Sequence, residues 1–400
     1  MFAAYAGRMP NDDLIALARL VLAGGPVLCR RRLLERYGSS RLALAAGAAA
    51  WRAEGLDAAQ IARLQDDAID DVLARTRRWL QVDGHHLIGW HDPDYPAPLR
   101  AMPSPPLALF VDGDPSLLWR PAVAVVGSRS PTSGGRDNAH AFARALASAG
   151  IVVVSGMARG VDAAAHEAAL AIGSGTTVAV VGTGPDTVYP PGHDRLRDQL
   201  ALQGAVVSEH PPGTPALRSH FPARNRILAG LSLGTLVVEA AERSGALITA
   251  RQAGEAGREV FAIPGSIHNP KARGCHRLIR DGAALVETAS EVIDALAPLA
   301  ADLANALRAR LGETESGVIA GPGDTPLRLD ADYQCLWEAL GHDPTGMDQL
   351  VSRTRLTAAE LSSMLLVMEL DGLVTAEHGR YLRKTGFFTS TASMTQAEGQ

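Results

Sequence analysis

Six short apolar runs, each closing on a small or polar residue, constrain this chain more than any other feature. They occupy residues 123–127, 151–155, 177–182, 205–209, 236–240 and 260–265. Amphipathic segments, such as residues 138–149 and 163–172, lie between them. Continuous apolar strands are typical of sheets buried on both faces, and their alternation with helices is typical of parallel sheets. The sequence therefore predicts an α/β fold in which helices cover both faces of a doubly wound sheet.

Glycines and polar residues collect where these predicted strands end. The turns are Gly127-Ser128-Arg129, residues 155–160, residues 182–184 and Ser208-Glu209. In doubly wound sheets, ligands bind beyond the carboxyl ends of the strands. Backbone N–H groups in glycine-rich turns attract anions, and the Arg129 guanidinium can clamp a phosphate. The alternative is that Arg129 pairs internally with Asp162 or Glu209.

Several ligand classes are excluded by what the chain lacks. Neither Gly127 nor the turn at residues 182–184 is followed by the remaining glycines of a dinucleotide fingerprint, so a nicotinamide or flavin cofactor is not expected. Lys271 and Lys384 are the only lysines and neither follows a glycine, which excludes a P-loop for ATP or GTP. The three cysteines show no paired metal spacing. We therefore expect no cofactor and no metal.

The distribution of apolar residues and of cysteines indicates the cellular compartment of the protein. No apolar run approaches the roughly 20 residues needed to span a bilayer, and the first residues show no basic region leading into an apolar core. The widely separated Cys29, Cys275 and Cys335 are typical of a reducing compartment. We expect a cytoplasmic protein that makes no membrane contact.

Residues 210–238 form a cationic segment in a chain whose net charge is −5. The segment contains three arginines, two histidines and Phe221, and it contains no Asp or Glu. Guanidinium groups neutralise phosphates and an aromatic ring stacks on unpaired bases, so this composition suits single-stranded nucleic acid. In the alternative, Arg224 and Arg226 cap and pair around a core helix, and Phe221 packs inside the protein.

Seven motifs follow one another along the central part of the chain. They are residues 125–129, residues 155–162 with Ala165-His166, Tyr189-Pro190, residues 208–213, residues 221–226 with Leu231-Ser232, residues 244–250 and residues 257–265. Each motif alone is weak evidence, but the ordered set resembles the DNA-processing protein A (DprA/Smf) family from about residue 85 to residue 295. Gly134 departs from the family, which often has a tyrosine there, and Cys275-His276 replaces a small polar pair.

The resemblance implies a function and a site. It implies an extended Rossmann-like core, without enzymatic activity, that binds single-stranded DNA and protects it. It also implies a homodimer formed through that core, which loads the RecA recombinase during natural transformation. Carried over by position, the DNA-binding residues are Gly127, Ser128, Arg129, Gly156, Arg218, Phe221, Arg224, Asn225 and Arg226.

The region before the core, residues 1–84, is predicted to be a helical domain. Apolar residues recur at helical spacing within residues 12–74, and Gly24-Gly25-Pro26 interrupts the pattern. The break followed by Arg30-Arg31-Arg32 suggests a SAM-like or helix-hairpin-helix domain that grips the DNA backbone. The alternative, which we favour, is a solvated basic helix end that complements the helix dipole.

The core is predicted to span residues 85–298. The region after it has three predicted parts. Residues 299–328 are a linker, since periodicity is lost over residues 303–326; residues 329–384 form a winged helix; residues 385–400 are a disordered tail. Helices are expected at residues 333–340, 347–351 and 357–370, the last opened by a capping box, with strands at residues 372–374 and 380–382. The third helix carries Glu360 and Glu369 and no basic residue, so we expect it to contact protein rather than duplex DNA.

Two other classes of function remain open at this point. Gly234-Thr235 followed by Glu239 loosely resembles the signature of the nucleotide phosphoribohydrolases often described as lysine decarboxylases, which cleave nucleoside monophosphates. Such an enzyme needs a positioned acid or base, and Glu209 is the other candidate. A pure interaction scaffold would account for the winged helix but not for Arg129, Arg218 and Phe221 meeting at one edge of the sheet.

Overall fold

The structure, a computed structural model, describes residues 11–315 continuously and the C-terminal part with gaps. The described C-terminal residues are 336–337, 339–340, 345–354, 356, 361, 364–365, 368, 374–377 and 380–383. The chain divides into two compact units, one ending at Glu313 and one beginning at Thr314. No helix in the described residues is long and apolar enough to cross a membrane.

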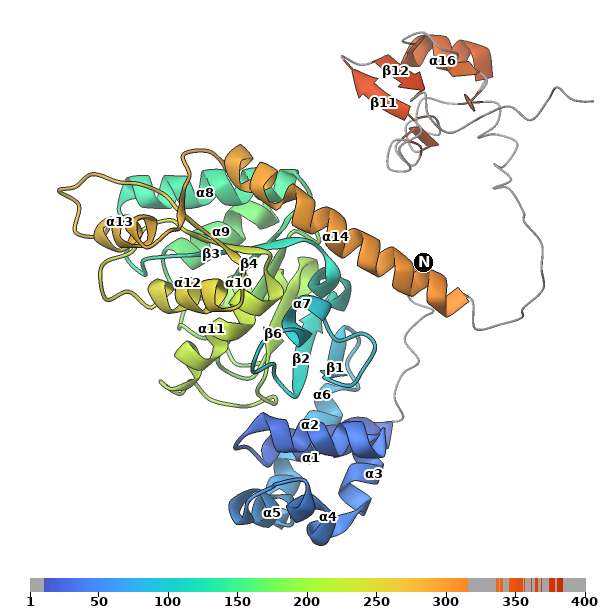
Figure 1. The fold of residues 1–400 in the computed structure, drawn as a ribbon, viewed down its shortest axis with the longest axis vertical. Helices are drawn as coiled ribbons and strands as arrows, with labels where there is room; N and C mark the ends of the chain where they lie inside the picture. The colour runs from blue at the N-terminus through green and yellow to red at the C-terminus, as the bar shows by residue number, and fades with distance from the viewer. Residues whose placement is uncertain are drawn as a thin grey trace, which may run out of the picture. The chain divides into compact units, whose positions relative to one another are not determined.

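A nine-stranded sheet forms the centre of the first unit (Figure 1). Its strands are β1 (His85–Gly89), β2 (Ala108–Gly113), β3 (Ala122–Val126), β4 (Val152–Ser155), β5 (Thr177–Val180), β6 (Ala205–Ser208), β7 (Gly234–Val237), β8 (Glu259–Ala262) and β9 (Ala284–Leu285). The spatial order is β1-β2-β6-β5-β4-β3-β7-β8-β9, and β6 through β9 in this order pair in parallel. The prediction of a doubly wound parallel sheet is confirmed, with one strand in each of the six apolar runs.

Sequence reasoning did not find the antiparallel extension made by β1 and β2. These strands pair with each other, and β2 pairs antiparallel with β6. Polar residues interrupt their apolar pattern: His85 opens β1, and Asp112 lies opposite it in β2. His85 Nε2 lies 3.3 Å from Asp112 Oδ1, so the polar pair is satisfied across the two strands. Only the pairing of distant segments reveals why these residues belong in a sheet.

Helices cover both faces of the sheet. One face packs against α8 (Ser133–Ser148), α9 (Val161–Leu170), α10 (Asp194–Gln203) and the start of α14 (Ala289–Glu315). The other packs against α7 (Ala97–Arg100), α11 (His220–Leu231), α12 (Ala246–Glu255) and α13 (Arg273–Arg280). Alternate side chains of each strand supply the two cores, because successive residues of a strand point to opposite faces: Val123 and Val125 pack on α8 and α9, whereas Ala122 and Val126 belong to the other core.

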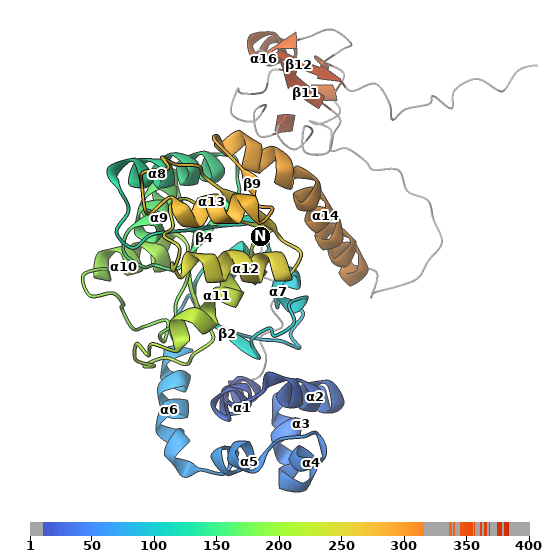
Figure 2. The ribbon, with the colours of Figure 1, turned by 60° about the vertical axis from the view of Figure 1, so that its left-hand side comes forward.

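The predicted N-terminal helical domain is present as a group of short helices (Figure 2). They are α1 (Asn11–Leu22), α2 (Val27–Tyr37), α3 (Ser40–Ala45), α4 (Gly47–Ala53), α5 (Ala58–Leu64) and α6 (Asp70–Trp79). Their apolar core includes Leu87 of β1 and Phe110 of β2, so it is continuous with the edge of the sheet. Arg30, in the basic segment of α2, is buried and donates to the carbonyls of Leu20, Val21 and Gly25. Its guanidinium caps the end of α1 instead of forming a solvated face or meeting a ligand.

The structure differs from the predicted linker at residues 299–315, which belong to α14. This stretch is rich in alanine and leucine, both strong helix formers. Ile293, Ala300 and Leu303 also pack against the core formed by α8 and α9. Tertiary burial therefore extends the helix beyond the point where periodicity fades in the sequence.

In the second unit, the described residues form a small sheet with helical segments. β10 (Thr345–Gly346), β11 (Val374–Glu377) and β12 (Arg380–Arg383) pair antiparallel in the order β10-β12-β11, and α16 (Met347–Thr354) follows β10. The strand predicted at residues 380–382 coincides with β12, whereas the one predicted at residues 372–374 overlaps β11 only at Val374. The predicted capping box at residues 357–360, Glu360, Glu369 and the tail at residues 385–400 lie outside the described residues.

Candidate functional site

A pocket of about 360 Å³ opens where the strand order reverses between β3 and β7. It is bounded by the turns after β3 and β4, by α11 and by the N-terminal end of α12. Five of the nine predicted site residues line it: Gly127, Arg129, Phe221, Arg224 and Asn225. The reversal of strand order leaves a crevice beyond the carboxyl ends of the strands. The turns after β3 and β4 both follow buried strands, so they lie at this crevice.

The turn after β3 brings the backbone of Gly127 very close to the start of α9 and to the end of β7. A Cβ atom on Gly127 would lie 2.7 Å from Val161 Cγ2, so only glycine fits. The Ser128 N–H donates to the carbonyl of Glu239 over 2.7 Å, which joins this turn to the end of β7. Arg129 is exposed, and no carboxylate of the described residues lies within 4.0 Å of it. The guanidinium is therefore available at the mouth of the pocket.

Gly156 and Arg224 fit together beneath the pocket. A Cβ atom on Gly156 would collide with the guanidinium of Arg224. Arg224 is buried and donates to the carbonyl of Val180 at the end of β5. Burial lowers the pKa of Arg224 to about 10, and the charge of Asp162 opposes this shift. Arg224 thus stays protonated at neutral pH but belongs to the interior of the fold.

Asp162 is buried on this side of the pocket, at the start of α9. Its Oδ2 accepts the N–H groups of Gly156 and Ala158 over 3.1 and 3.3 Å. Burial raises the pKa of Asp162, and the charge of Arg224 together with these hydrogen bonds acts in the opposite direction. Arg224 and Asp162 thus interact in the interior, whereas Arg129 is exposed at the mouth of the pocket.

Phe221 lies at the start of α11 and is half-buried. It lines the pocket, and its ring centroid lies 4.9 Å from that of Tyr189. Asn225, one turn later, also lines the pocket and lies within 3.5 Å of the Gly245 carbonyl through its Nδ2. The position of Phe221 differs from the alternative in which the ring packs inside the protein.

Besides Gly156, three predicted residues lie away from the pocket lining. Arg218 is exposed in the loop before α11. Arg226 donates to Glu209, and both side chains are largely buried. Ser128 accepts the Ser130 N–H through its Oγ. The structure therefore supports the internal alternative for Arg226, because it pairs with Glu209 instead of facing the pocket.

Sequence reasoning missed the contribution of α12. Ser244, Gly245 and Thr249 line the pocket from the N-terminal end of this helix. They lie in a motif that contributed to the family resemblance but to which no role was assigned. Glu239, which belongs to the phosphoribohydrolase alternative, accepts the Thr132 N–H through Oε2 and the Asn269 Nδ2 through Oε1, so it connects two loops.

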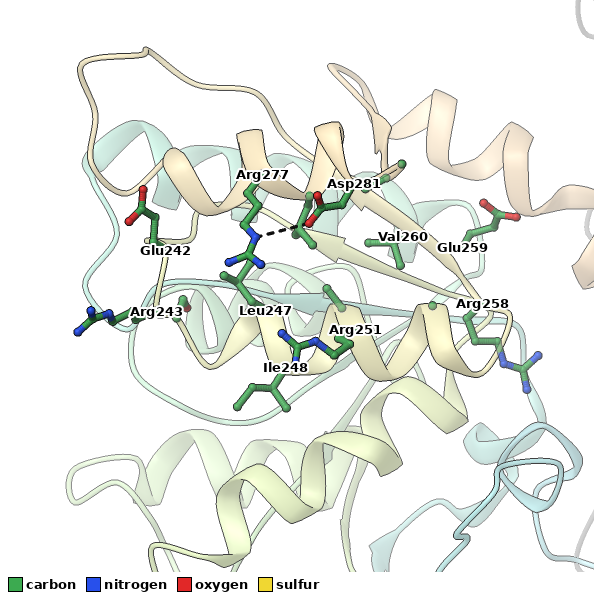
Figure 3. Close-up of a pocket in the computed structure, with 16 residues that line it drawn as sticks. Glu242, Arg243, Leu247, Ile248, Arg251, Arg258, Glu259, Val260, Arg277 and Asp281 are labelled. Atoms are coloured by element: carbon green, nitrogen blue, oxygen red, sulfur yellow. Dashed lines mark ion pairs between the residues drawn. The ribbon is translucent and has the colours of Figure 1, made fainter.

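A second pocket, of about 550 Å³, lies between α12 and α13 (Figure 3). Leu247, Val260 and Leu278 contribute apolar lining, and Arg277 forms an ion pair with Asp281 over 3.5 Å. None of the nine predicted residues lines this pocket. Ile248 borders both pockets, so the first turns of α12 separate them.

Comparison with known proteins gives a consistent result along the chain. The sequence model of DNA recombination-mediator protein A matches residues 86–297, and that of the DprA winged helix domain matches residues 320–380. Protein Smf of Escherichia coli K12 is 40% identical over 306 residues, which cover 76% of this chain and 79% of that protein. DNA processing protein DprA of Streptococcus pneumoniae is 45% identical over 225 residues, covering 54% and 79%.

A solved structure agrees with these sequence matches. The X-ray structure of DNA processing protein A from Streptococcus pneumoniae superposes with a TM-score of 0.61 at 37% identity, and covers 70% of this chain and 97% of that one. The C-terminal unit, whose described residues include a small antiparallel sheet, matches the DprA winged helix domain model and is a winged-helix domain. With a family model that matches more than half of its residues and relatives aligned over most of its length, the chain belongs to the DNA recombination-mediator protein A family.

Proposed function

We propose that this protein binds single-stranded DNA in the pocket between the β3 turn and α11. The observation that carries the proposal is that an exposed guanidinium, Arg129, with no ion pair among the described residues, and a half-buried ring, Phe221, line the same pocket. The family description as a recombination mediator and the DNA-processing names of the relatives support it. In this proposal, the protein protects incoming DNA and loads the RecA recombinase during natural transformation.

The chemistry of the pocket favours an unpaired strand. Arg129 and the glycine-rich turn attract a phosphate, while Phe221 offers a face on which any base can stack. In a duplex, the bases are already stacked on one another and would have to leave the helix to reach the ring. A single strand avoids that energetic cost, so it binds more tightly than a duplex of the same sequence.

The proposal includes a non-enzymatic, cytoplasmic homodimer that assembles through the α/β core. The two acids that a phosphoribohydrolase would require are already engaged. Glu239 accepts hydrogen bonds from Thr132 and Asn269, and Glu209 pairs with Arg226. These contacts support the non-enzymatic proposal, because a general acid or base must reach the proton that it transfers. Light scattering on the purified chain tests the dimer, and nucleoside monophosphate cleavage tests the rival activity.

We expect Arg129→Ala to weaken single-strand binding and to reduce the salt dependence of the affinity. Loss of one phosphate contact lowers the slope of log affinity against log salt by about 0.7 for a single strand. Fluorescence anisotropy with single- and double-stranded oligonucleotides at two salt concentrations measures both quantities. The matched control is Arg144→Ala, which removes an exposed arginine from α8. Equal slopes in the two variants would show that Arg129 makes no phosphate contact and would overturn the assigned site.

Recruitment of RecA requires a separate readout. DNA strand exchange by RecA on oligonucleotides already coated with a single-strand binding protein measures loading directly. We expect the full chain to accelerate this exchange, and Arg129→Ala to accelerate it less. An unchanged rate with the full chain, under conditions where it binds the strand, would contradict the loading function but leave DNA binding intact.

A further inference from the structure

We propose that Tyr189 and Arg159 form a second nucleotide position next to the pocket. This inference rests on the proposed binding of single-stranded DNA and extends it. A strand that leaves the pocket over Phe221 places its next base on Tyr189 and its phosphate at Arg159. Neither residue lines the pocket itself; Tyr189 contacts Phe221, and Arg159 lies near the Pro191 carbonyl on the Tyr189 loop.

The two aromatic rings form a continuous surface. The ring centroids of Tyr189 and Phe221 are 4.9 Å apart, with 39° between the ring planes. Tyr189 is 38% exposed, which leaves room for a base to contact the ring. Phe221 in turn lies at 3.3 Å from the Cβ position of Gly182, so it packs tightly on the end of the β5 turn. Aromatic side chains that follow one another in this way are the platforms on which successive unpaired bases stack.

Hydrogen bonds hold the Tyr189 loop in place. His193 contacts the Met157 carbonyl over 3.1 Å through Nδ1, which ties the loop between β5 and α10 to the turn after β4. Arg159 Nη2 lies 3.5 Å from the Pro191 carbonyl on the same loop. The Thr183 hydroxyl donates to the Thr187 carbonyl across the base of the loop. A preorganised ring loses little conformational entropy when a base binds to it.

Arg159 provides positive charge beside this ring. It is exposed, and no carboxylate of the described residues lies within 4.0 Å of it. Its weak contact with Pro191 places the guanidinium close to the Tyr189 loop without neutralising it. Arg129 and Arg159 therefore lie on turns after adjacent strands, β3 and β4, and can contact different phosphates of one strand.

The test uses oligothymidylates of two, four, eight and twelve nucleotides with the full-length protein. Tyr189→Ala should bind the longer oligonucleotides about tenfold more weakly, and bind the dinucleotide with unchanged affinity. Phe221→Ala should weaken binding at every length. Tyr189→Phe keeps the ring and should match the original protein, as should Leu202→Ala, a control at an exposed apolar residue of α10. Equal affinities of Tyr189→Ala and the original protein at every length would overturn the second position.

Two further measurements make the result independent of folding defects. Arg159→Ala should lower the salt slope by about 0.7 for the longer oligonucleotides, and Arg144→Ala should not. In the unaltered protein, an oligonucleotide carrying 5-iodouracil should photo-crosslink to the peptide that contains Tyr189. A crosslink confined to the Phe221 peptide would overturn this inference alone. Unchanged binding by both Phe221→Ala and Arg129→Ala would overturn the proposed function itself.

Discussion

At the scale of single residues, the contact between Gly156 and Arg224 supports the floor of the pocket. Position 156 accommodates only glycine, because the Arg224 guanidinium occupies the space where a Cβ atom would lie. We expect Gly156→Ala to destabilise the protein by about 1–3 kcal/mol, since overpacking displaces a buried charge from its hydrogen bond. DNA affinity should fall as well, because Arg224 lines the pocket. Urea unfolding and fluorescence anisotropy measure the two effects.

The control for this substitution is Gly134→Ala. Gly134 lies in α8, and apart from its chain neighbours and the backbone of its own helix, no atom of the described residues lies within 4 Å of its Cβ position. Alanine there should stabilise the protein by about 0.5–1 kcal/mol, because glycine is less favourable within a helix. If both variants unfold at the same urea concentration as the original protein, the close approach of Gly156 to Arg224 does not hold.

The lowered pKa of His210 predicts that the folded protein loses stability in mild acid. Burial, with the charges of His220 and Arg226, lowers the pKa of His210 to about 4. The unfolded chain protonates histidine near pH 6.5, so between about pH 6.5 and 4 it binds more protons than the folded chain. Stability therefore falls as the pH falls through this window, by up to about 1.4 kcal/mol per pH unit for one histidine.

Replacing the imidazole of His210 separates its contribution to the pH dependence of stability from that of another buried histidine, His166. His166, whose pKa burial lowers to about 3, contributes in the same direction. His210→Phe keeps an aromatic ring against His220, whose centroid lies 3.8 Å away. We expect the variant to lose less stability than the original protein between pH 7 and pH 5 in urea titrations. Parallel pH profiles for the two proteins would show that His210 does not remain neutral in the folded state.

At the scale of elements, α11 explains why three adjacent residues have different surroundings. Successive residues of a helix point about 100° apart, so Arg224, Asn225 and Arg226 cannot face one ligand together. Arg224 points to the sheet and donates to Val180, while Arg226 reaches Glu209. The motif places these residues on one helix, and the helix then separates their roles.

In the N-terminal bundle, Arg30 connects two elements. It donates to three carbonyls at the end of α1 and just after it, and burial lowers its pKa to about 10. We expect Arg30→Ala to lower the free energy of unfolding by about 1–3 kcal/mol, because buried carbonyl acceptors lose their donor. Arg32, exposed on the same helix, is the control, and Arg32→Ala should change stability by less than about 0.5 kcal/mol. Thermal unfolding compares them, and equal midpoints would contradict the capping role.

At the scale of the whole molecule, the two units allow a test of where DNA binds. Every residue assigned to the pocket lies in the first unit. A chain ending at Glu315 retains all of α14, whereas a cut at Leu303 would remove part of a helix that packs on the core. We expect the shortened chain to bind oligonucleotides within a few-fold of the full chain and to remain a dimer. A loss of more than about 1.4 kcal/mol, which is tenfold, in a folded dimer would assign DNA contacts to the winged helix.

The sequence by itself determined the class of the fold and the edge that holds the site. Six apolar runs specify six parallel strands, because a strand buried on both faces has no polar side to expose. Parallel strands bring their carboxyl ends to one edge, so the turns at Gly127 and Gly156 had to meet there. The glycines themselves signal close approach, although the sequence does not name the atoms that approach them.

Only the tertiary structure decided which charged residues are free. Arg129 and Arg226 are alike in the sequence, yet Arg129 is exposed with no ion pair in the described part of the chain, whereas Arg226 pairs with Glu209. Tyr189 became a candidate because folding brings it against Phe221, 32 positions away in the chain. Ion pairing and ring contacts depend on distances between segments that are remote in sequence. A local sequence pattern shows the periodicity of a helix or strand. It does not show which side chain each residue will contact when the helices and strands pack together.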